Sequence, residues 1–110
     1  MGNKNIGPLN DIKVVELATV LAGPGVGRYL ADFGAEVIKV ESPEGDPTRR
    51  MGWTGTNESD SYFWKLVNRN KSVISLDLKI SENKEILWAI IKDVDVLIEN
   101  FRPGKLAKLG

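Results

Sequence analysis

The glycine-rich segment of residues 21–41, which reads LAGPGVGRYLADFGAEVIKVE, constrains the fold more than any other part of this sequence. It follows the apolar run of residues 12–17, so the predicted order is strand, glycine-rich turn, helix and strand, which is one right-handed βαβ unit. A glycine-rich turn that leads into a helix leaves backbone N–H groups free at the positive end of the helix dipole. Such a turn suits an anion, most often a phosphate.

The helix of this unit is predicted to begin at Pro24, whose missing N–H costs nothing in a first helical turn. Its apolar residues recur at helical spacing and predict one apolar face, formed by Val26, Tyr29, Leu30 and Phe33. Gly34 follows where the end of a helix favours a left-handed residue. The second strand is predicted at residues 36–41, with Val37, Ile38 and Val40 in the core.

The remaining sequence continues the alternation of strands and helices. Residues 42–60 contain several prolines and glycines and the pair Arg49 and Arg50, which indicates a long loop of the kind that tends to be functional. A short helical turn over residues 61–70 is expected to pack Tyr62, Phe63 and Trp64 on the sheet. A third strand is predicted at residues 72–78.

The last third of the chain predicts another helix and strand. Ser81 is a plausible N-cap, and the residues behind it with helical spacing are Leu87, Ile90, Ile91 and Val94. A fourth strand is predicted at residues 95–101, and Pro103 is expected to open a further helix. Four strands alternating with helices predict an α/β protein with a Rossmann-like open parallel sheet and flanking helices.

The length and composition indicate one modest domain. Residues 1–10 are interpreted as a flexible lead-in and residues 11–110 as one α/β portion, whose abrupt end in the last helix suggests part of a larger domain. The formal net charge is zero, so no overall field recruits nucleic acid or a membrane. There is no apolar run of the roughly 20 residues that span a bilayer and no signal peptide, which predicts a cytoplasmic protein.

Two residue types that carry much enzyme chemistry are absent. Without cysteine, the chain has no disulfide, thiolate nucleophile or cysteine-ligated zinc. Without histidine, it has no serine triad and no histidine metal site, and no metal is expected. Carboxylates, lysines, tyrosines and backbone dipoles remain as its chemical groups.

The carboxyl ends of the four predicted strands are expected to meet at one rim, where ligands bind in open parallel sheets. Lys79 and Arg102 bring positive charge to this rim, Lys105 and Lys108 are expected to add to it, and Arg49 and Arg50 are expected to fold over it from the long loop. These charges suggest a phosphate-rich ligand that contains adenine. Each feature also has a plainer interpretation: turn glycines, solvated arginines and aromatic core residues.

A dinucleotide site with Glu41 on the ribose is one alternative. However, the turn reads GPGVGR, which lacks the last glycine of G-x-G-x-x-G, and Pro24 removes an N–H donor. No Walker-type G-K-[ST] is present either.

A set of ordered motifs carries a family resemblance. They are LNDIKVVEL at residues 9–17, LAGP at 21–24, LADFGAEVIKVE at 30–41, GDPTR at 45–49, NRNKS at 68–72, LDLK at 76–79 and ENFRPG at 99–104. Together they resemble the amino-terminal portion of the class III CoA-transferases, which include formyl-CoA transferases, carnitine CoA-transferases and α-methylacyl-CoA racemases. The resemblance covers nearly the whole chain from Leu9.

The resemblance implies a site for coenzyme A at the strand ends. By matching position, the implied contacts are Leu21, Ala22, Ser42, Leu76, Asp77, Leu78, Lys79, Asn100, Phe101, Arg102 and Lys108. Ser42 stands where some members of the family carry arginine. Lys108 also stands at an arginine position, where lysine keeps the charge but loses the bidentate fork.

The family resemblance also implies the reaction and the partners. It implies an enzyme that moves coenzyme A between an acyl-CoA donor and a carboxylic acid through an aspartyl intermediate, in a homodimer of a longer protein. None of the aspartates in this sequence matches the family's nucleophile, so this segment alone is expected to be inactive. The alternatives are the racemase branch of the family and a truncated, non-catalytic remnant.

Overall fold

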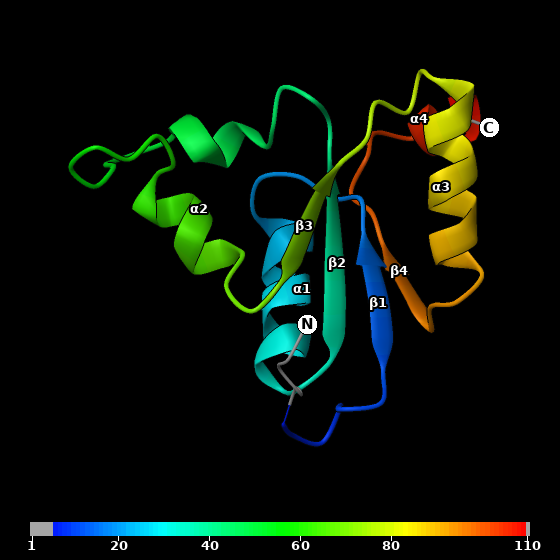
Figure 1. Ribbon diagram of the computed structural model, residues 1–110, viewed down its shortest axis with the longest axis horizontal. Coiled ribbons are helices and arrows are strands. Elements are labelled where there is room, and N and C mark those ends of the chain that lie inside the picture. The colour runs from blue at the N-terminus through cyan, green and yellow to red at the C-terminus, as the bar shows by residue number, and fades with distance from the viewer. Residues whose placement is uncertain (1–5, 110) are drawn as a thin grey trace.

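The computed structural model describes residues 6–109 and forms a parallel sheet with helices on both faces (Figure 1). The strands are β1 (Lys13–Glu16), β2 (Glu36–Glu41), β3 (Ser72–Ser75) and β4 (Val96–Ile98). The helices are α1 (Ala22–Asp32), the 3-10 helix η1 (Pro47–Arg50), α2 (Tyr62–Val67), α3 (Ser81–Ile91) and α4 (Lys105–Lys108). The predicted α/β class is confirmed.

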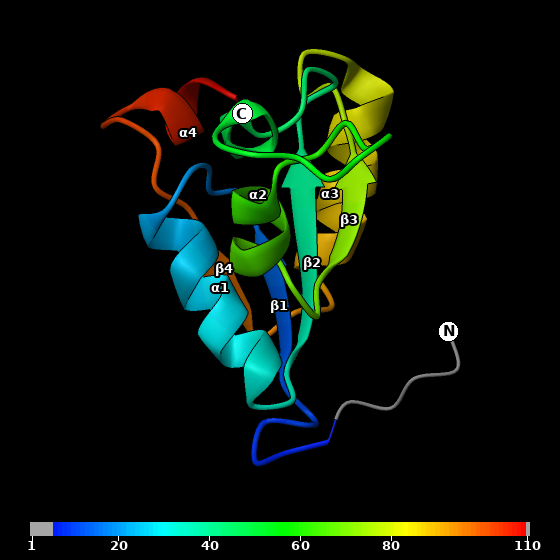
Figure 2. The ribbon, with the colours of Figure 1, turned by 90° about the vertical axis from the view of Figure 1, so that its left-hand side faces the viewer.

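The sheet has the order β3-β2-β1-β4, with every neighbouring pair parallel. The chain therefore moves outward from β1 to β3 and returns across the sheet to place β4 on the other side of β1. Helix α1 covers one face and α3 the opposite face, while α2 lies on the same side as α1 (Figure 2). The reversal of strand order next to β1 is the position at which sheets of this kind bind ligands.

Two apolar clusters hold the layers together. The α1 side comprises Val14, Ala18, Ala31, Ala35, Val37 and Ile98. On the α3 side, Val15, Leu17, Val40 and Leu76 are buried against partly buried residues that include Leu87, Ile90, Ile91 and Val94. The predicted inner face of α3 is therefore confirmed.

The predicted apolar face of α1 is wrong in most of its residues. Val26 is 50% exposed, Tyr29 58% and Phe33 54%, and of this face Leu30 packs against the core. The buried residues of α1 are instead small and include Gly23, Gly27 and Ala31. This stripe, with a spacing of four residues, lets the helix backbone lie close to β1, so close approach and not side-chain size decides which face is buried.

Several predicted boundaries also change. The third and fourth strands are shorter than the predicted 72–78 and 95–101, and residues 76–78 run on as a loop. Ser81 is not an N-cap, because α3 begins at Ser81 itself after Ile80. Pro103 precedes α4, whose cap is the left-handed Gly104.

The start of the described chain lies against the end of α1. The N–H of Leu9 donates to the carbonyl of Phe33, and Leu9 packs on the core. The predicted lead-in of residues 1–10 falls partly outside the described residues, since these begin at Ile6.

Candidate functional site

A cavity of about 360 Å³ lies beyond the carboxyl ends of the strands. The segments that follow all four strands contribute to its wall, at the top of the view in Figure 1. Its lining residues are Leu17, Thr19, Val40, Glu41, Ser42, Pro43, Glu44, Gly45, Asp46, Leu76, Asp77, Leu78, Lys79, Phe101, Lys105 and Leu109. The strand ends therefore meet at one rim, as the sequence predicts.

Internal partners occupy most of the acidic groups in this wall. Glu41 accepts bonds from Arg49 Nε at 2.8 Å and from Trp64 Nε1 at 2.9 Å. Asp46 is paired with Lys39 at 2.9 Å, and Asp77 accepts the N–H of Lys79 at 3.0 Å. These carboxylates therefore stabilise the wall itself.

The two lysines of the wall have no such partners. Within residues 6–109, no carboxylate forms an ion pair with the ammonium of Lys79 or Lys105, while Glu44 is an exposed acid that is also unpaired. Lys105 Nζ lies 4.9 Å from the ring centre of Phe101, within range of a cation–π contact. The cavity thus offers two available ammonium groups and an aromatic ring, which together suit an anionic ligand.

The turn between β1 and α1 is held by side chains from other strands. Asn100 accepts the N–H of Thr19 at 2.9 Å and donates to its carbonyl at 2.8 Å. The N–H of Val20 donates to both oxygens of Asp46 at 3.3 Å, and Lys39 Nζ donates to the carbonyl of Ala18 at 3.0 Å. The turn is therefore fixed from the β2 side and from the β4 side.

A buried network of four charged residues underlies this turn. Lys39 Nζ lies 2.9 Å from Glu16 Oε2 and 2.9 Å from Asp46 Oδ2, and Lys71 Nζ lies 2.7 Å from Glu16 Oε1. All four side chains are fully buried. Two positive and two negative groups balance one another, as buried charges require.

Two of these groups have shifted pKa values. Burial alone would raise the pKa of Asp46, but the hydrogen bonds from Thr48 and the ammonium of Lys39 outweigh it and hold this pKa below its ordinary 3.8. Burial lowers the pKa of Lys71, and the Glu16 carboxylate offsets only part of that effect. Asp46 is therefore firmly ionised at neutral pH.

The network explains one glycine of the turn motif, and close packing on Ala18 explains another. A Cβ on Gly27 would lie 2.0 Å from Glu16 Oε1, and a Cβ on Gly23 would lie 2.1 Å from the Cβ of Ala18. Both glycines thus permit α1 to pack closely on β1 and on the residue Ala18 beyond its end. The motif has an internal structural role here, in contrast to the dinucleotide fingerprint considered from the sequence.

Sequence reasoning did not identify Glu16, Lys39 and Asp46. A signal was present, since Glu16 and Lys39 are charges inside apolar strands and face each other in the register of β1 and β2. Asp46 belongs to the GDPTR motif, where it caps η1 by accepting the N–H of Thr48 at 3.0 Å.

Six of the eleven predicted contacts line the cavity: Ser42, Leu76, Asp77, Leu78, Lys79 and Phe101. Five are not among its lining residues: Leu21, Ala22, Asn100, Arg102 and Lys108. Of these five, Asn100 is bonded to Thr19, a lining residue. Arg102 and Lys108 are exposed in the last described segment. The binding roles of all eleven remain predictions.

Arg49 does not extend over the rim, contrary to the possibility drawn from the sequence. Its guanidinium lies 3.8 Å from the ring centre of Trp64 and pairs with Glu41 and Asp60. Arg50 donates to the carbonyl of Glu44 at 3.1 Å. Arg49 therefore fastens the long loop to the end of β2 and to α2.

No group of three or more acidic residues in residues 6–109 could hold a metal ion. No helix within the same range is long and apolar enough to cross a membrane.

Comparison with known proteins gives consistent matches over nearly the whole chain. The model of CoA-transferase family III matches residues 9–110. A succinate–glutarate CoA-transferase from Agrobacterium fabrum is 47% identical over 110 residues, which cover 94% of this chain and 27% of that protein. A succinyl-CoA–D-citramalate CoA-transferase from Chloroflexus aurantiacus is 45% identical over 104 residues, which cover 94% and 26%.

The fold agrees with a solved structure. A crystal structure of a CaiB/BaiF family protein from Brucella suis matches with a TM-score of 0.87 and 45% sequence identity, covering 96% of this chain and 28% of that one. The chain thus spans about a quarter of the length of the curated relatives that it matches.

Proposed function

This chain belongs to CoA-transferase family III, and from that premise we propose that it forms the coenzyme A binding portion of a CoA-transferase. The proposed enzyme moves coenzyme A from an acyl-CoA donor to a carboxylic acid acceptor. The observation that carries the proposal is the cavity at the four strand ends, with Lys79 and Lys105 available for the phosphates of the ligand.

The eleven predicted contacts are proposed to act in three groups. Ser42, the loop residues 76–79 and Phe101 line the cavity and would contact the nucleotide directly. Asn100 would act through Thr19, because its side-chain oxygen and nitrogen both form hydrogen bonds with the backbone of Thr19. Leu21, Ala22, Arg102 and Lys108 are proposed to contact ligand atoms that extend beyond the described cavity.

The proposed reaction proceeds through an aspartyl intermediate. An aspartate carboxylate attacks the donor thioester, which forms a mixed anhydride and releases coenzyme A as a thiolate. The thiolate then attacks the aspartyl carbonyl, releases the donor acid and leaves an aspartyl-CoA thioester. The acceptor carboxylate attacks this thioester, which forms a second mixed anhydride and releases the thiolate again. The thiolate then attacks the acceptor carbonyl of this anhydride, which forms the new acyl-CoA and releases the aspartate carboxylate.

We assign the nucleophile to none of the aspartates in this chain. The oxygens of Asp46 are occupied by Lys39, Thr48 and the N–H of Val20. Asp32 is bonded to Arg69 and Asn70.

A homodimer and a cytoplasmic location remain predictions from the sequence.

Calorimetric titration of the folded chain with coenzyme A tests the binding part of this proposal. We expect saturable binding of coenzyme A in preference to NAD. Replacing Lys79→Ala is expected to weaken binding about tenfold, because a charge-assisted contact to phosphate is lost.

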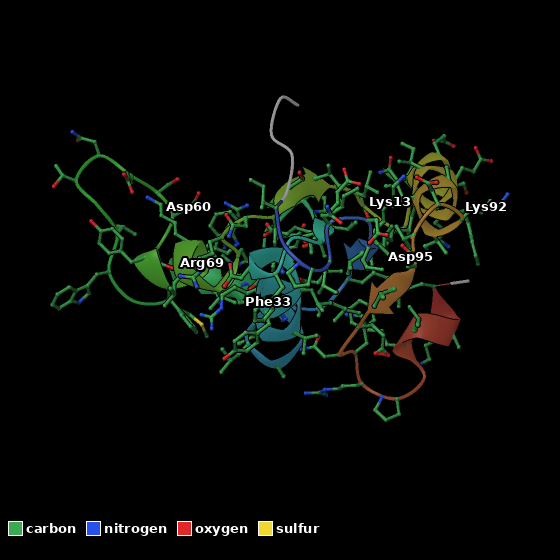
Figure 3. All side chains as sticks on the ribbon, turned by 90° about the horizontal axis from the view of Figure 1, so that it is seen from below. Lys13, Phe33, Asp60, Arg69, Lys92 and Asp95 are labelled. Atoms are coloured by element: carbon green, nitrogen blue, oxygen red, sulfur yellow. The ribbon has the colours of Figure 1, made fainter. Side chains whose placement is uncertain are left out.

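Lys92→Ala is the matched control. Lys92 is exposed and lies on the side of α3 away from the sheet (Figure 3), so its loss should leave the dissociation constant unchanged. No heat of binding at millimolar coenzyme A, or preference for NAD, would refute the proposal.

A further inference from the structure

Val20, in the turn between β1 and α1, has a strained backbone. Its φ is 68°, in the left-handed region that β-branched residues rarely adopt. Such a conformation persists only when surrounding contacts determine it. Thr19, the residue before it, lines the candidate cavity.

The strained residue Val20 donates its N–H to the side chain of Asp46. Both of its carboxylate oxygens lie 3.3 Å from the N–H of Val20. Lys39 Nζ pairs with Asp46 Oδ2 at 2.9 Å. Thr48 donates both its N–H and its hydroxyl to Asp46 Oδ1, at 3.0 and 2.8 Å. Because all these donors converge on one buried group, Asp46 has no freedom to turn away from Val20.

We propose that Asp46 is a positioning residue for the ligand cavity, which holds the turn of residues 19–21 in its left-handed form so that Thr19 and the start of α1 are correctly placed. Asn100 supports the same turn from the β4 side through Thr19. The inference rests on the proposed function in one respect: the ligand is taken to be coenzyme A.

The turn would otherwise relax. Without the contact to Asp46, Val20 relieves its backbone strain by leaving the left-handed region. The binding-competent turn then becomes a minor state. The apparent affinity then falls by the fraction of molecules that remain competent. If about one molecule in ten keeps the turn, the dissociation constant rises about tenfold.

A double-mutant cycle between Asp46→Asn and Val20→Gly tests this idea. Glycine adopts a positive φ without steric cost, so the turn no longer needs to be held. Asp46→Asn is expected to weaken coenzyme A binding about tenfold when residue 20 is valine and less than threefold when it is glycine. Equal effects in the two backgrounds would overturn the inference, since a general structural role of Asp46 does not depend on residue 20.

Asp93→Asn is the charge-matched control. Asp93 is exposed, pairs with Lys13 at 3.0 Å and is not among the residues that line the cavity. Its replacement makes the same chemical change as Asp46→Asn and removes the same charge. We expect this variant to bind coenzyme A as tightly as the unchanged chain, and an equal loss of binding would contradict a role that is specific to the Asp46 contact.

Hydrogen exchange of the Val20 amide provides a readout that needs no ligand. Asp46→Asn and Asn100→Ala are both expected to speed exchange in residues 19–21 at least tenfold while amides of β1 and β2 stay protected. Asn100 is exposed, so its replacement should leave the fold intact even if that of Asp46 does not. Unchanged exchange in residues 19–21 would overturn the inference, whereas loss of coenzyme A binding by the unchanged chain would refute only the proposed function.

Discussion

At the scale of single residues, the Glu16 side chain on β1 requires glycine at position 27 of α1. Replacing Gly27→Ala would place a methyl group 2.0 Å from the Glu16 carboxylate. Overpacking of this kind costs about 1–3 kcal/mol. We therefore expect a lower thermal midpoint and a lower free energy of unfolding by urea.

Gly25→Ala is the control within the same helix. A Cβ at this position would meet no atom within 4 Å, so alanine should stabilise α1 by up to about 1 kcal/mol through its helix propensity. A larger loss from Gly25→Ala than from Gly27→Ala would show that the Glu16 contact is not what requires glycine.

Lys39 is predicted to be indispensable for the fold. Lys39→Met leaves the fully buried Asp46 without its cation and Glu16 with Lys71 alone. Breaking a buried pair in this way costs about 3–5 kcal/mol. Urea unfolding should show this loss, while Lys13→Met, which breaks the exposed pair with Asp93, should change little. Similar effects at both lysines would contradict the account.

Acid should unfold the protein through its paired aspartates. Burial alone would raise the pKa of Asp46, but the hydrogen bonds from Thr48 and the ammonium of Lys39 lower it. The pKa of Asp32 is lowered chiefly by its hydrogen bond with Arg69. An aspartate whose pKa is lower in the folded protein stabilises the fold at pH values above its unfolded pKa, which is near 3.8. This stabilisation is lost as the pH falls through the pKa of the folded protein. The melting midpoint should therefore be steady from about pH 7 to 5 and fall below about pH 4. A midpoint that rises on acidification would contradict these directions.

Helix α1 shows at the scale of elements where sequence patterns reach their limit. The glycine-rich turn, the start near Pro24 and the end at Gly34 were predictable, because each is a local backbone requirement. The buried face was not, since the apolar spacing and the spacing of small residues indicate different faces. Only the closeness of Ala18 to Gly23 and of Glu16 to Gly27 decides between them.

Two substitutions in α1 test this assignment of its faces. Leu30→Ala should destabilise the protein by about 2 kcal/mol, because Leu30 packs on the core. Val26→Ala should be close to neutral, because Val26 is half exposed and alanine favours the helix. Thermal melting of the two variants measures the difference, and a greater loss at Val26 would restore the face predicted from the sequence.

At the scale of the whole molecule, the sequence predicted the parallel sheet and the convergence of its strand ends, because both follow from the alternation of strands and helices. It did not predict that Asp46 and Asn100 would clamp the first turn, since these contacts join residues 26 and 81 positions apart. Asp46 belongs to the GDPTR motif and Asn100 to ENFRPG, but neither motif indicates which residues these two side chains touch.

The cavity at the four strand ends is proposed to receive coenzyme A. Mapping amide chemical shifts by NMR while coenzyme A is added locates the bound ligand directly. We expect the shifted signals to cluster in residues 17–21, 42–46, 76–79 and 100–105. Shifts that gather at the amino ends of the strands, around Lys13 and Asp95 in Figure 3, would contradict it.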